Sequence, residues 1–164
     1  SQPVITLHEV THKVLNYWSF TRPELFPGIC VISEGASDFF PASFLNNPVI
    51  GYDEVTRKPI RSLDLRLDSQ RILSSLDGTL SLMVRNGKLD EHDASQILSW
   101  YLWALRRELA DPRKVELAAY KAFLRYAEML EANPAQLPFD NRYELFRQQI
   151  IRYVNILNAY LDVS

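Results

Sequence analysis

The chain has 164 residues, a net charge of -2 and a pI near 5.9. This length is typical of one domain with a substantial core, and the charge provides no basic field that would hold a nucleic-acid backbone. No run approaches the roughly 18 apolar residues of a membrane helix. We therefore expect a single soluble domain, residues 1–164, that neither binds nucleic acid nor spans a membrane.

Helical patterns dominate the first part of the chain. Residues 6–20 repeat apolar side chains every three or four positions, and Thr6 with Glu9 matches a capping box, so we expect an amphipathic helix that begins there. RPELFPG, residues 22–28, breaks this helix with two prolines and a glycine. Residues 29–45 then resume a strongly apolar helical pattern.

The middle of the chain is less regular. Residues 46–66 are rich in turn residues and predict a long surface loop, a kind of segment that often carries function. A short helix over 68–76 and an irregular or hairpin-like piece around DGT and RNGK follow. Three further helices are expected over 91–110, 112–132 and 139–162. Because alternating strand patterns are scarce, the predicted fold class is mainly α.

Two of the three histidines of the chain stand in TLHEVTHKV, residues 6–14. On a helix, His8 and His12 lie one turn apart on the same face and can both reach one tetrahedral ion. Glu9 is rotated by about 100° from His8, which places its carboxylate beside such an ion, where a general base for a metal-activated water belongs. The alternative is that both histidines are solvated side chains of an ordinary helix.

A third ligand is expected in the next helix, in SEGASDFF. Glu34 and Asp38 are carboxylates one turn apart inside an apolar stretch, where burial is costly unless a cationic partner lies opposite. A metal ion with its histidines supplies that partner. Asp38 is placed to accept the second ring N–H of a ligand histidine. Gly35 allows two helices to approach closely, although ordinary packing explains a glycine there equally well.

HEVTH, followed 22 residues after His12 by Glu34 in SEGASDFF, resembles the gluzincin zinc metallopeptidases, and most closely the thermolysin-like enzymes with their E-x-x-S-D segment. NNPVIGYDEVTRKPIRSLD and HDASQILSWYLWALRREL resemble later segments of the same family. The resemblance covers residues 4–110, and the helices over 112–162 fit it only as generic helices. It implies a zincin-like helical catalytic domain with one zinc ion per chain.

Carried over by position, the resemblance implies His8, His12 and Glu34 as zinc ligands and Glu9 as the base that activates the water. Asp38 is then expected to orient His8. His92 takes the role of the imidazole that stabilises the oxyanion, and Arg61 contacts a substrate carbonyl and the groups that surround the ligands. Without the resemblance, His92 is an exposed residue at a helix start and Arg61 a surface cation. The implied function is a zinc-dependent endopeptidase acting on peptide or protein substrates.

The sequence also departs from the family pattern. Ser33 stands where relatives carry an asparagine that bonds the second histidine, and Val4 stands where an aspartate would help to bind calcium, so no calcium is predicted. Only seven residues precede His8, whereas the family has a β-sheet domain upstream. The chain is therefore expected to be half of a larger processed peptidase whose β-domain is a separate chain, a minimal gluzincin, or a family remnant acting as a helical protein-interaction module. A homo-oligomer is a further expectation, and analogy with the family points to a secreted or periplasmic protein.

Overall fold

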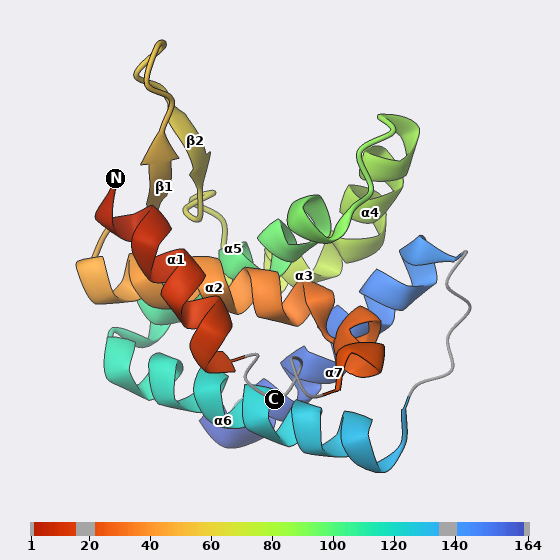
Figure 1. Cartoon of the computed structure of the whole chain (residues 1–164). Coiled ribbons are helices and arrows are strands. Elements are labelled where there is room, and N and C mark those ends of the chain that lie inside the picture. The colour runs from red at the N-terminus through yellow and green to blue at the C-terminus, as the bar shows by residue number, and fades with distance from the viewer. Residues whose placement is uncertain (1, 16–21, 135–140, 163–164) are drawn as a thin grey trace.

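The computed structural model describes residues 2–15, 22–134 and 141–162. It is mainly helical, as the sequence predicts, with one small antiparallel sheet (Figure 1). The elements, in chain order, are α1 (Pro3–Leu15), the 3-10 helix η2 (Pro23–Gly28), α2 (Cys30–Leu45), β1 (Val49–Tyr52), β2 (Pro59–Ser62), α3 (Ser69–Ser74), α4 (Leu76–Arg85), α5 (Glu91–Leu109), α6 (Pro112–Ala132) and α7 (Arg142–Leu161).

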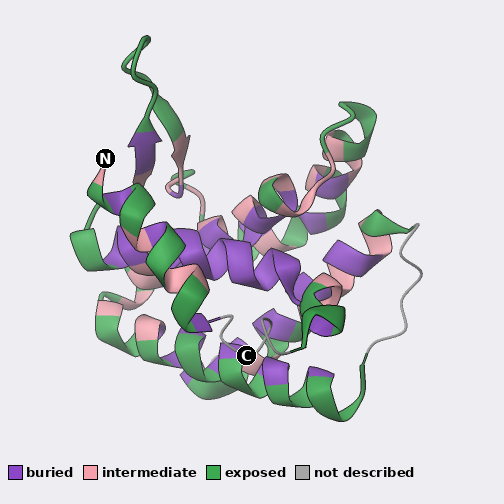
Figure 2. Cartoon of the chain, in the orientation of Figure 1, coloured by how far each residue is buried: buried purple, intermediate pink, exposed green. Residues whose placement is uncertain are grey.

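Helix α2 forms the centre of the domain, and Figure 2 shows it buried over almost its whole length. Helices α1, α5, α6 and α7 pack around it. This explains its composition, since a helix covered on all sides has to be apolar all round. Its C-terminus is closed by Asn46, whose backbone adopts the left-handed conformation that ends many helices.

The contact between α2 and α5 depends on Gly35. A Cβ atom at this position would lie 3.0 Å from Leu98 Cδ2 and 3.1 Å from the Ser95 carbonyl oxygen. The hydroxyl of Ser99 also donates a hydrogen bond to the Gly35 carbonyl at 3.1 Å. The expected close approach of two helices is therefore present, and it holds α2 directly against the start of α5.

The predicted start of the first helix and the predicted form of two later segments were wrong. The first helix begins at Pro3 rather than at a Thr6 cap, because proline is well suited to a first helical position and the Gln2 carbonyl accepts the first helical bonds. The expected loop over 46–66 contains the β1–β2 hairpin, paired from Val49 with Ser62 to Tyr52 with Pro59. The expected irregular piece around DGT is part of α4, because Leu76 and Leu80 bury one face of a regular helix there.

The other predicted helices are confirmed within a few residues. Asp90, Asp111 and Asn141 each cap a helix by accepting a backbone N–H three residues further on, which fixes the starts of α5, α6 and α7. The predicted residues 16–20 and 139–140 lie outside the described part of the chain. Among the described helices, none is both long and apolar enough to cross a membrane.

Candidate metal centre

Helices α1 and α2 bring three ligand atoms together. His8 and His12 lie one turn apart on α1, on the side that packs against α2, and their Nε2 atoms are 3.0 Å apart. The Glu34 carboxylate reaches up from α2, with Oε1 3.1 Å from His12 Nε2 and Oε2 3.6 Å from His8 Nε2. A tetrahedral ion bound at about 2.0 to 2.1 Å holds its ligand nitrogens about 3.3 Å apart. These three residues could therefore hold a metal ion with little rearrangement.

The outer nitrogens of both imidazoles are held by α2. His8 Nδ1 donates a hydrogen bond to Asp38 Oδ1 at 2.7 Å, which fixes the ring orientation and directs Nε2 toward the cluster. His12 Nδ1 lies 3.1 Å from Ser33 Oγ. Ser33 thus contacts the second histidine from the position where the gluzincin pattern has an asparagine. It can do so because it stands one position before Glu34 on the buried helix. Sequence reasoning missed this role, since a serine there departs from the family pattern.

The close contacts in the cluster shift the pKa values of His8 and Glu34. Burial alone lowers the pKa of His8, but hydrogen bonds to Asp38 and Glu34 outweigh it and raise the pKa to about 9. Burial alone raises the pKa of Glu34, yet the two histidines hold it well below its ordinary value. The ring of His8 and the carboxylate of Glu34 thus stabilise each other's charged forms in the metal-free protein. A divalent ion would replace the proton on the imidazole as the cationic partner of Glu34.

Arg61 links the hairpin to this cluster. It lies on β2, opposite Ile50 of β1, and its guanidinium donates to both Asp38 oxygens at 2.6 Å. Burial raises the pKa of the Asp38 carboxyl, but its bonds to His8 and Arg61 reverse this effect and keep the pKa low. The hairpin is also tied to α5, because Trp100 Nε1 donates to the Ser62 carbonyl at 3.0 Å. Arg61, Asp38 and His8 therefore form one continuous chain of polar contacts.

Glu9 and His92 differ from the ligand residues in exposure. Glu9 follows His8 on α1 and is exposed to solvent. His92 lies in the first turn of α5, and its Nε2 is 3.6 Å from Glu34 Oε1 while 64% of its side chain remains exposed. The fold thus brings His92 next to Glu34, although 58 positions separate them in the sequence. Its exposed ring is available to a molecule that approaches Glu34.

Comparisons with protein-family models, with curated proteins and with solved structures found no match to this chain.

Proposed function

We propose that the protein is a zinc-dependent endopeptidase of the gluzincin type, with a zincin-like helical domain. The observation that carries this proposal is the convergence of His8 Nε2, His12 Nε2 and the Glu34 carboxylate at 3.0 to 3.6 Å. Two imidazoles and one carboxylate are the ligand set of many catalytic zinc sites, which leave a fourth position open. When bound there, zinc would lower the pKa of water toward 7 and polarise a carbonyl group.

The residues around the ligands have the chemical types that peptide hydrolysis requires. Glu9, one position after a ligand, would accept the proton of the attacking water and later deliver it to the leaving amine. His92 would donate a hydrogen bond to the oxygen on which negative charge develops. Asp38 would keep the ring of His8 in the tautomer that binds metal, and Arg61 would hold Asp38 in place and contact the substrate carbonyl. Each site residue predicted from the sequence then has a defined task.

Cleavage of peptides by the zinc-loaded protein tests this proposal. A mixture of internally quenched fluorogenic peptides is incubated with the wild-type protein, with Glu9→Gln and with Glu128→Gln, an isosteric control at an exposed position on α6. We expect cleavage by the wild type and the control. In Glu9→Gln the rate should fall at least about 100-fold, the usual contribution of a general base, with zinc affinity unchanged.

The same assay separates the enzyme from the alternative, a helical interaction module that retains the metal or only the fold. Bound zinc without turnover in any peptide mixture would favour a metal-stabilised module. Equal cleavage by Glu9→Gln and the wild type would contradict the role given to Glu9.

A further inference from the structure

Helix α6 carries an apolar row on the face that points away from the core. Leu117, Tyr120 and Leu124 follow one another at steps of three and four residues, so their side chains form one line along the helix. They are 54%, 41% and 43% exposed. Figure 2 shows this outer side of α6 as exposed, while Val115 and Phe123 on the opposite side are fully buried. A row of exposed apolar side chains along one helix is a candidate interaction surface.

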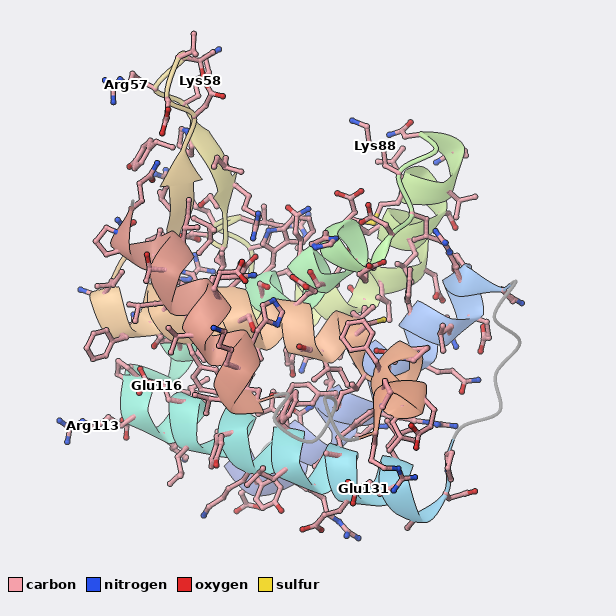
Figure 3. All side chains as sticks on the ribbon, in the orientation of Figure 1. Arg57, Lys58, Lys88, Arg113, Glu116 and Glu131 are labelled. Carbon is pink, nitrogen blue, oxygen red and sulfur yellow. The ribbon has the colours of Figure 1, made fainter. Side chains whose placement is uncertain are left out.

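A charged residue continues this line at each end. Arg113 precedes Leu117 by one turn and Glu131 follows Leu124 by two turns. Figure 3 shows the two side chains at opposite ends of α6. We name Arg113, Leu117, Tyr120, Leu124 and Glu131 the α6 stripe. Its positions 113, 117, 120, 124 and 131 have the spacing of a coiled-coil seam, the pattern by which one helix packs against another, except that the seam position between 124 and 131 is the buried Ala127.

The two ends of the α6 stripe carry opposite charges. The first turn contains no acidic residue and the last turn no basic residue, whereas the basic Arg113 begins the helix and the acidic Glu131 ends it. The anionic side chain of Asp111 caps the N-terminus, which favours negative charge, and Glu131 near the C-terminus lies within electrostatic range of Arg22. Another copy of the helix that ran antiparallel to α6 would place an opposite charge at each end of the stripe.

We propose that the α6 stripe binds the same stripe of a second copy of this chain, with the two helices antiparallel about a twofold axis near Ala122. Ala122 is equidistant in sequence from Arg113 and Glu131, so both ends match at once. Arg113 pairs with the partner subunit's Glu131, and Tyr120 packs against the partner subunit's Leu124. Such an isologous contact uses one patch twice. The metal centre is not required for it.

The size of the contact predicts its strength. A helix of 21 residues is about 31 Å long, and one helix face buries an area at the low end of specific interfaces. Phe44, which is 78% exposed, follows Ser43, whose hydroxyl bonds Glu116 on α6, so further apolar surface lies on α2 near the start of α6. We therefore expect a dimer that dissociates on dilution, with a dissociation constant of about 1 to 100 µM.

Charge reversal at the two ends tests the dimer and its antiparallel register. Sedimentation velocity is measured from about 1 to 300 µM, a range that brackets the expected dissociation constant. The proteins are the wild type, Arg113→Glu, Glu131→Arg and the double variant. Each single variant opposes like charges at both ends and should weaken the dimer at least about fivefold. The double variant exchanges the two charges, so it should dimerise like the wild type.

Two controls separate this effect from damage to the fold. Lys88→Glu makes the same change of charge at an exposed position after α4, which Figure 3 shows far from α6, and should leave the dimer intact. Arg113→Glu adds an anion near the helix N-terminus, so its thermal midpoint at low concentration should not fall.

Three results would overturn the proposal. The first is a wild-type protein that stays monomeric at every concentration. The second is a dimer that both single variants leave unchanged, which would place the contact on another face. The third is a double variant as weak as the single ones, which would exclude the antiparallel pairing of Arg113 with the partner subunit's Glu131.

Discussion

Replacing Asp38 with asparagine should weaken both the fold and the metal site. The Asp38 side chain is almost fully buried and accepts three hydrogen bonds, one from His8 Nδ1 at 2.7 Å and two from the Arg61 guanidinium at 2.6 Å. Asparagine keeps the shape of this side chain but removes its charge. Its amide group can accept at one oxygen only, so a donor of Arg61 or of His8 loses its partner.

The expected loss of stability in Asp38→Asn follows from the burial of the ion pair between Asp38 and Arg61. Removing one partner of a buried ion pair costs about 3 to 5 kcal/mol, but the Arg61 side chain is 30% exposed, so water compensates part of the loss. We expect the free energy of unfolding of the metal-free protein to fall by about 2 to 3 kcal/mol. Zinc affinity should also fall by about 10- to 100-fold, because the histidine ligand loses the carboxylate that orients it.

Urea denaturation with a chelator present measures the first quantity, and competition with a zinc-binding dye measures the second. Asp64→Asn is the matched control, because Asp64 also pairs with an arginine, Arg107, at 2.8 Å, but contacts no histidine. A surface pair of this kind contributes about 0 to 1 kcal/mol, so the control should lose little stability and no zinc affinity. Equal zinc affinity in Asp38→Asn and the wild type would refute the role of Asp38 as the group that orients His8.

Three further predictions follow from the same contacts. Gly35→Ala should destabilise the protein by about 1 to 3 kcal/mol, because the new methyl group overpacks the contact with α5. Gly78→Ala should stabilise it by about 0.5 to 1 kcal/mol, because its methyl group meets open space on α4. Thermal denaturation measures both changes. Glu34→Ala should weaken zinc binding more than Asp38→Ala does, and the reverse order in isothermal titration would make the ligand assignment wrong. In the metal-free protein, the raised pKa of His8 adds stability that is fully present below about pH 6.5 and is lost as pH rises through about 9. Urea midpoints should show this decline in the wild type and not in His8→Gln.

The long helices could be predicted from the sequence because their signals are local. The apolar period and the capping residues Asp90, Asp111 and Asn141 agree with each other, and burial in the domain reinforces both. The hairpin could not be predicted, because its strands of four residues are too short for an alternating pattern to stand out. Helix α4 was missed because Asp77 and Gly78 usually mark a turn, and the packing of Leu76 and Leu80 overrides that preference.

The candidate site also combines features that the local sequence predicts with features that depend on how the helices pack. The spacing of His8 and His12 on one helix face was readable from the sequence, since a helix fixes residues four positions apart. Their distance to Glu34 depends on how α1 packs against α2; the carboxylate pair of Glu34 and Asp38 in an apolar helix and the resemblance to gluzincins both suggested this contact. The contact of Ser33 with His12 and the bidentate contact of Arg61 with Asp38 require the three-dimensional arrangement. His92 approaches Glu34 only because Gly35 lets the start of α5 lie against α2.

The metal content of the purified protein tests the central claim most directly. Protein prepared without added metal, and a parallel preparation of His12→Ala, are analysed by mass spectrometry for zinc and other metals per chain. The account predicts close to one zinc per chain in the wild type and little in the variant, with both proteins folded by circular dichroism. A wild-type protein that holds no zinc even after incubation with the metal, or a variant that holds as much as the wild type, would contradict it.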